Sequence, residues 1–132
     1  MTRILIIILL AFNGLGAVYG GIMLISDPSG WKLGLPISLL EHSPFEDFLI
    51  PGFILFIVIG LGNLVVCGLV ILRTGKNASW VIVAGFALAV WIAVQLLMIR
   101  QVHYLHIIYA FVGILLMILG IIDRKRELEG SD

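Results

Sequence analysis

The sequence predicts an all-α integral membrane protein, a four-helix bundle with both termini on the cytoplasmic side. Three observations support this prediction: the composition, four long uncharged apolar runs, and an uneven distribution of Lys and Arg between the connecting segments. Of the 132 residues, 61% are hydrophobic and 12% are charged, whereas a soluble domain has about 45–50% apolar and about 25% charged residues. A soluble fold needs polar residues to cover its surface, so this composition favours a chain surrounded by lipid.

Four apolar runs are long enough to cross a bilayer. They cover residues 4–25, 48–72, 80–99 and 105–122, and they leave an outer loop at 26–47 and a cytoplasmic tail at 123–132 within a single membrane domain. About 18 or more apolar residues with almost no charge are typical of a transmembrane helix. At a rise of about 1.5 Å per residue, even the shortest run approaches the hydrocarbon thickness of roughly 30 Å.

The first run has an alternative interpretation as a cleaved signal peptide. Arg3 precedes the apolar run, and residues 18–20 form a tolerable cleavage site. The apolar character continues to Ile25, which is too long for a usual signal-peptide core. We therefore expect this helix to be retained.

Orientation follows from the basic residues, because cytoplasmic loops carry an excess of Lys and Arg. In the four-span arrangement only Lys32 and Arg100 lie on one side. The other six share the opposite side: Arg3, Arg73, Lys76, Arg124, Lys125 and Arg126. The sequence therefore predicts cytoplasmic termini in a multi-pass cell-membrane protein.

The start of the second run has the form of a capping box. Ser43 is a candidate N-cap, Pro44 would occupy the first helical position, and Glu46 follows the cap by three residues. Further along this run, Pro51 lacks the backbone N–H that a helix uses as a donor, which predicts a kink at this residue. Most of the charged residues in 41–47 are therefore interpreted as part of the start of a helix.

Small residues mark the faces on which the four helices are expected to meet. Lipid is as apolar as leucine, so helices in a bilayer associate through close packing and interhelical hydrogen bonds. The predicted packing positions are Gly16, Gly20, Gly60, Gly85 and Gly113.

Three strongly polar side chains fall inside the spans: Asn13, Asn63 and Gln95. Amides are costly to leave unpaired in hydrocarbon, so we expect them to face the bundle. They are interpreted first as interhelical hydrogen-bonding groups and alternatively as the lining of a polar pore. No Asp, Glu, Lys or Arg lies in the middle of a predicted span. Because ion and proton carriers commonly use an ionisable group inside the membrane, this weakens the interpretation as a proton-coupled transporter.

An outer-face polar cluster is predicted from Glu41, His42, His103 and His106. His103 and His106 are three residues apart, so both point the same way in a helical turn. Imidazoles with carboxylates can hold a divalent metal, but such histidines are usually interfacial residues with solvated rings. Neither a metal nor another cofactor is predicted, and the catalytic residues are left unknown.

The run from Gly52 through Gly60 to Asn63, continued past Arg73 into the third span, resembles small bacterial four-helix membrane proteins of the DoxX-like kind. The resemblance covers about the middle half of the chain and depends on the placement of glycines. It implies a bacterial cytoplasmic-membrane protein, an accessory to respiratory or thiol-redox partners.

The leading functional hypothesis is a non-enzymatic membrane protein that acts through lipid or protein partners, as an accessory subunit. It would contact membrane lipids and assemble as a homo-oligomer or in a larger membrane complex. The formal net charge of zero gives no field that would attract nucleic acid. Two alternatives stay open: a small oligomeric transporter or channel, and a metal or redox site built on the outer histidines.

Overall fold

The computed structural model describes residues 2–34, 36–41, 43–72, 77–99 and 104–129, and their regular structure is entirely helical. The first helix is α1 (Thr2–Ser26). A second rod is made of α2 (Leu49–Ile54), the π-helix η3 (Leu55–Leu61) and α3 (Gly62–Leu72), which follow one another without a break. The third and fourth long helices are α4 (Ala78–Ile99) and α5 (Tyr104–Leu128), and two short 3-10 helices, η1 (Trp31–Leu33) and η2 (Ile37–Leu40), lie in the first connection.

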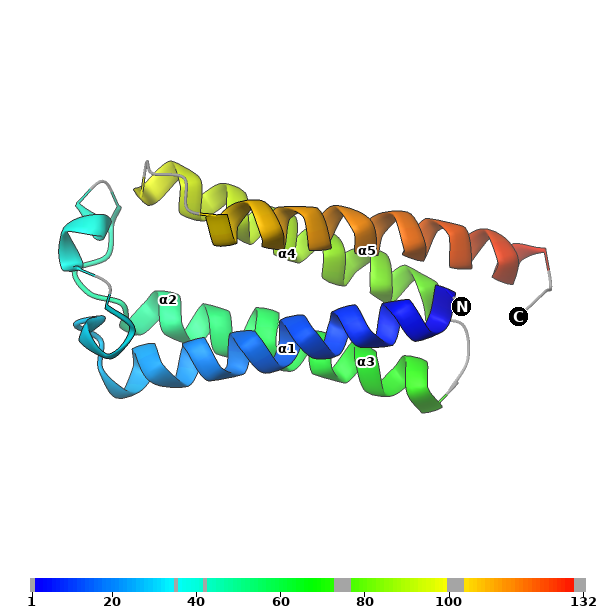
Figure 1. The fold of residues 1–132 in the computed structure, drawn as a ribbon, viewed down its shortest axis with the longest axis horizontal. Coiled ribbons are helices and arrows are strands. Elements are labelled where there is room, and N and C mark those ends of the chain that lie inside the picture. Colours follow the sequence, from blue (N-terminus) through cyan, green and yellow to red (C-terminus); the bar gives the residue numbers. More distant parts are fainter. Residues whose placement is uncertain (1, 35, 42, 73–76, 100–103, 130–132) are drawn as a thin grey trace.

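The helices form two antiparallel hairpins (Figure 1). One hairpin pairs α1 with the second rod, and the other pairs α4 with α5. The start of α1 and the end of α5 lie at one end of the bundle, and η1 and η2 lie at the opposite end. The predicted four-helix, all-α architecture is therefore confirmed.

Glycines bring the backbones of the first hairpin close together. A Cβ placed on Gly60 would lie 2.8 Å from Val18 Cγ2, and one on Gly21 would lie 2.6 Å from Phe56 Cβ. Real Cβ atoms do not approach other atoms this closely, so these positions accept no side chain without a shift. The close approach lets α1 and the second rod gain dispersion contacts along their whole length.

The second hairpin closes on a reciprocal glycine contact. A Cβ on Gly85 of α4 would lie 2.6 Å from the carbonyl oxygen of Gly113 on α5, and one on Gly113 would lie 3.0 Å from the carbonyl oxygen of Gly85. One contact between the two hairpins is aromatic: the rings of Phe12 on α1 and Tyr109 on α5 stack with centroids 5.7 Å apart.

All five predicted packing glycines face another helix, although not equally closely. Gly16 lies beside the Tyr109 hydroxyl and Gly20 beside Leu55 at the more exposed edge of α1. Four further glycines have Cβ positions that atoms of a neighbouring helix occupy: Gly14, Gly21, Gly52 and Gly120.

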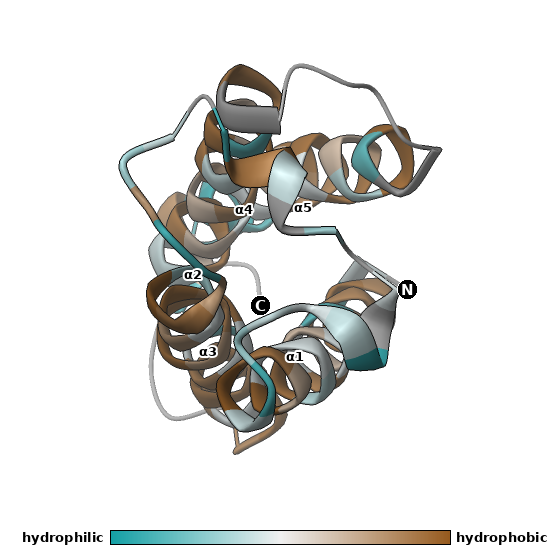
Figure 2. Cartoon of the chain, turned by 90° about the vertical axis from the view of Figure 1, so that its left-hand side faces the viewer, coloured by the Kyte–Doolittle hydropathy of each residue, from teal (hydrophilic) through white to brown (hydrophobic). Residues whose placement is uncertain are grey.

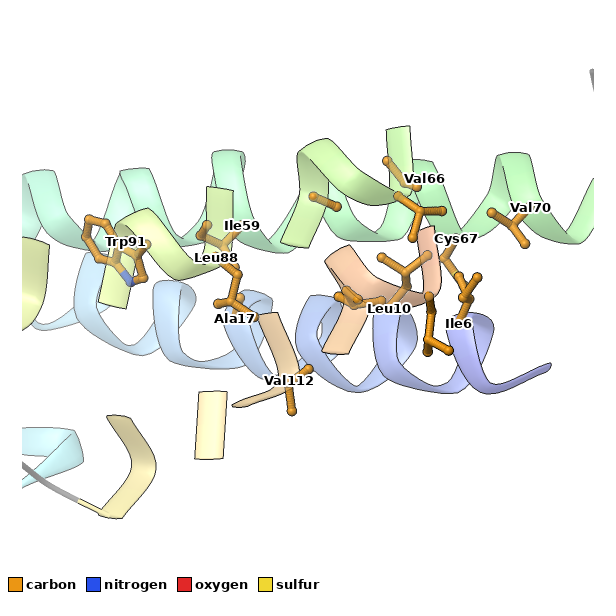
Figure 3. Packing of buried hydrophobic residues seen from close by; sticks show 14 of the residues in the cluster. Ile6, Leu10, Ala17, Ile59, Val66, Cys67, Val70, Leu88, Trp91 and Val112 are labelled. Atoms are coloured by element: carbon orange, nitrogen blue, oxygen red, sulfur yellow. The ribbon is translucent and has the colours of Figure 1, made fainter. Parts of the chain in front are cut away.

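Apolar side chains from all four long helices fill the interior (Figure 3). Figure 3 shows Ile6, Leu10 and Ala17 of α1 close to residues of the second rod such as Ile59 and Val66. A smaller apolar cluster, Leu24, Leu40 and Phe48, fastens the first connection to the helix ends.

Apolar side chains also cover the outside of the bundle. In each candidate span only about a third of the residues are buried, and hydrophobic colour predominates on the long helices in Figure 2. All four helices are long and apolar enough to cross a membrane. Large, strongly exposed side chains occur on every one of them, for example Leu15, Val65, Phe86 and Phe111.

The second rod begins later than predicted, and the capping-box prediction is wrong. Helix α2 starts at Leu49, and its N-cap residue, Phe48, makes no side-chain cap. The hydroxyl of Ser43 instead donates to the carbonyl of Leu40 and accepts from the N–H of Phe45, forming a local turn. Such turns compete with capping for serine side chains.

Pro51 fits into the helix without the kink that the sequence predicted, because no helical hydrogen bond is lost at this position. Pro51 lies in the first turn of α2, where backbone N–H groups have no partner within the helix. The departure from α geometry lies further along, in the π-helix η3, where i→i+5 hydrogen bonds replace the usual register.

Side chains near the two termini cap helices that they do not belong to. Arg3 donates from Nε and Nη2 to the carbonyl of Val70, at 3.1 and 2.7 Å, and from Nη2 to that of Ile71 at 2.9 Å. The N–H of Ala78, at the start of α4, donates to Glu127 Oε1 at 3.0 Å. Helix α5 extends beyond the predicted span end at 122. Glu127 in its last turn thereby caps the first turn of α4.

Candidate functional site

Two asparagines form the polar centre of an otherwise apolar interior. The side chains of Asn13 and Asn63 are 1% and 2% exposed. Asn13 lies between Leu10 and Ala17 on the buried stripe of α1. Asn63 begins the buried stripe of α3 directly after the π-helix. Each asparagine thus occupies a position that its helix turns inward.

The two asparagines lie at the same depth because of the antiparallel register of α1 and the second rod. A Cβ on Gly14 would meet Leu64 Cδ2 at 2.7 Å and the carbonyl oxygen of Gly60 at 3.2 Å. One turn or more toward the termini, Cys67 Sγ approaches the carbonyl of Ile7 at 3.7 Å. Positions 13 and 63 fall between these two contacts. We call them the asparagine pair.

One amide hydrogen bond is present at this level. Asn63 Nδ2 donates to the carbonyl oxygen of Ile59 at 2.6 Å. The same carbonyl accepts the backbone N–H of Gly62, which also donates to Ile57, five residues earlier. The π-helix therefore ends where the Asn63 side chain returns to its own backbone. π-Helical turns of this kind are frequent at functional sites.

The remaining polar atoms of the pair have no hydrogen-bond partner among the described residues. These atoms are Asn13 Nδ2, Asn13 Oδ1 and Asn63 Oδ1. An amide moved from water into an apolar environment without a hydrogen bond costs about 2–7 kcal/mol, depending on the reference state. A cost of that size makes the asparagine pair the strongest candidate site in the described part of the chain.

Gln95 does not belong to the asparagine pair. It is half-buried on α4. Helices α1 and α4 start at the same end of the bundle, and Gln95 lies about 9 Å further from that end than Asn13 does. Of the three amides predicted to face the bundle, Asn13 and Asn63 therefore have buried side chains. Gln95 lies on a partly exposed face of α4.

The outer-face polar cluster is described only in part. Glu41 is exposed and ends η2, and His106 is half-buried in the first turn of α5. Helix η2 and the start of α5 both lie at the end of the bundle opposite the start of α1 (Figure 1), whereas His42 and His103 lie outside the described residues. Among the residues that the structure describes, no three His, Cys, Asp or Glu side chains come together as a metal site.

The first connection is folded around Asp27. Its carboxylate accepts the Ser29 hydroxyl at 2.6 Å and the backbone N–H of Lys32 at 3.2 Å. The hydrogen bond from Ser29, assisted by the backbone donors and the Lys32 charge, holds the pKa of Asp27 below its ordinary value. The N–H of Phe48 donates to the carbonyl of Pro28 at 2.8 Å, which ties this turn to the start of the second rod.

Sequence reasoning identified both members of the asparagine pair but missed the π-helix beside them. An interior Gly60-Leu-Gly62 sequence followed by an asparagine is the only local signal, and it does not distinguish π from α geometry. The terminal caps of Arg3 and Glu127 were missed as well, since a basic residue before a span is usually explained as an anchor.

A comparison with protein-family models, with curated proteins and with solved structures finds no match to this chain.

Proposed function

We propose that the protein is a multi-pass integral membrane protein that works without enzymatic chemistry, as an accessory subunit acting through lipid or protein partners. One observation carries this proposal: every long helix presents large apolar side chains outward along its length. A monomeric soluble protein rarely exposes more than a few hundred Å² of contiguous apolar surface, whereas lipid or a partner helix accepts it.

The charges support an orientation with cytoplasmic termini. Arg3 belongs to the first turn of α1 and residues 124–126 to the last turns of α5, and these two helix ends lie together at one end of the bundle, whereas η1, which contains Lys32, lies at the other (Figure 1). This distribution follows the positive-inside rule. At the Lys32 end, Trp31 is 84% exposed, and tryptophan is enriched at the headgroup level of membranes.

The packing supports a role in assembly. The glycine contacts within each hairpin fix the interior, while residues such as Phe86 and Phe111, 60% and 65% exposed, remain free to contact lipid or another protein. The resemblance of residues 52–63 to proteins of the DoxX-like kind supports a bacterial cytoplasmic membrane and respiratory or thiol-redox partners.

Site-specific photocrosslinking in native membranes tests this function. A photoreactive phenylalanine analogue replaces Phe86 or Phe111 on the surface, and Trp91, which is 9% exposed, serves as the buried aromatic control. We expect discrete adducts with one protein or with lipid from the two surface positions and none from position 91. Equal adducts from all three positions would contradict the proposed surface.

A second candidate is a small oligomeric transporter or channel, and the buried asparagine pair is the observation that favours it. Solute flux into proteoliposomes separates the two candidates. Flux that Asn63→Leu abolishes while the helical content is unchanged would favour transport. The absence of flux for the unaltered protein, combined with discrete protein adducts, would favour the accessory role.

A further inference from the structure

The asparagine pair presents a definite set of hydrogen-bonding groups to the interior. The amide orientation of Asn63 is fixed, because its Nδ2 faces the carbonyl of Ile59, which can only accept. Its Oδ1 is therefore a buried acceptor, and Asn13 adds a further acceptor and a donor. The pair thus offers two acceptor oxygens and the two N–H groups of Asn13 Nδ2 to a ligand.

A water molecule has the complementary groups, since it can donate two hydrogen bonds and accept one or more. It can accept from Nδ2 and donate to Oδ1 of Asn13 on the edge where the N–H and C=O of a primary amide lie side by side. Its second hydrogen is then available to Asn63 Oδ1. Buried waters in proteins typically make about three hydrogen bonds, to groups that otherwise lack partners. We propose that Asn13 and Asn63 form a binding site for a water molecule that bridges α1 and α3.

The surroundings select a neutral ligand. The neighbours of the pair on the buried stripes are Leu10, Ala17, Ile59 and Val66, all apolar and at most 8% exposed. Burying an ion there without a countercharge is costly, whereas water brings no charge. The site is independent of the proposed function, because a bridging water is compatible with an accessory subunit and with a solute pathway.

Nuclear magnetic resonance on the full chain in detergent micelles tests this site. Selective ¹⁵N labelling of asparagine gives three side-chain amides, from Asn13, Asn63 and Asn77. Asn77 is the internal reference, because its Nδ2 donates to the carbonyl of Leu69 at 3.1 Å. We expect a dipolar cross-peak between water and the Asn13 side-chain amide, with opposite sign in laboratory-frame and rotating-frame spectra, which distinguishes a bound water from chemical exchange.

The variant Asn63→Leu is expected to abolish that cross-peak, because the water loses one of its three partners, while the Asn77 signal stays unchanged. A water cross-peak that survives in the variant would show that Asn63 is not part of the site and would overturn the proposal. So would a direct contact between the two amides in the unaltered protein without a water signal. If Asn63→Leu does not fold, the spectrum of the unaltered protein still decides between a bound water and a direct amide pair.

Discussion

The substitution Gly85→Ala tests whether the second hairpin depends on contact between two backbones. The added Cβ would lie 2.6 Å from the carbonyl oxygen of Gly113, 2.9 Å from Leu116 Cβ and 2.9 Å from the backbone nitrogen of Met117. Two of these three atoms belong to the backbone of α5, so they cannot move aside by a change of side-chain rotamer. Relief requires that α4 and α5 separate over several turns.

Gly68→Ala is the matched control for this substitution. Gly68 lies inside α3, and a Cβ placed on it would meet nothing within 4 Å. Both alanines gain helix propensity of up to about 1 kcal/mol relative to glycine, so this gain cancels in the comparison. What remains is the overpacking at Gly85, about 1–3 kcal/mol, which corresponds to a difference of about 5- to 150-fold in the unfolding equilibrium.

Reversible unfolding in lipid bicelles, followed by steric trapping, measures this difference. We expect Gly85→Ala to be less stable than Gly68→Ala by that amount, with Gly68→Ala equal to or more stable than the unaltered protein. Equal stability of the two variants would refute the reasoning, because the α4 and α5 backbones would then have room for a methyl group.

Three further predictions concern the helix ends and the first connection. Arg3→Lys keeps the charge but loses the forked contact with the end of α3, and we expect a loss of about 1–2 kcal/mol in the free energy of unfolding. Glu127→Ala removes the acceptor at the start of α4, with an expected loss of about 0.5–2 kcal/mol in the same assay. Ser29→Ala removes the main cause of the lowered pKa of Asp27, so the Asp27 carboxyl should titrate at a higher pH in ¹³C spectra. Since a lowered carboxyl pKa stabilises the folded state above its ordinary pKa, the contribution of Asp27 should be lost as the pH falls through the lowered value.

Each of these predictions has a control in the same chain. Arg124→Lys conserves charge at an exposed position and should leave stability unchanged, as should Glu129→Ala at the exposed end of the chain. Losses as large in these controls as at Arg3 and Glu127 would indicate a general effect of charge or orientation instead of capping. An Asp27 pKa that does not respond to Ser29→Ala would contradict the hydrogen-bonded turn.

The helices and their approximate bounds could be predicted from the sequence, because hydrophobicity over about 20 residues is a property of the chain itself. The inward position of Asn13 and Asn63 was likewise predictable, since an amide has few alternatives among apolar residues. The start of the second rod was not. Ser43, Pro44 and Glu46 satisfy a local capping pattern, but the tie between Phe48 and Pro28 and the apolar cluster around Phe48 place these residues in the folded connection.

The glycine contacts between helices could likewise be predicted only in part from the sequence. The sequence shows many small residues in α1, and any of several stripes would suit helix packing. The tertiary structure places Gly14 and Gly21 against the second rod and leaves Gly16 and Gly20 nearer the edge, because the rotation of α1 depends on what the other helices offer.

By itself, the sequence determined that this chain is a bundle of four helices able to cross a membrane, because the length and apolar character of each run are local properties. Only the tertiary structure decided that Asn13 and Asn63 share one depth, that a π-helix ends beside them, and that Arg3 and Glu127 cap neighbouring helices. Each of these features depends on the register and rotation of one helix against another. Those quantities are fixed by contacts between residues far apart in the chain.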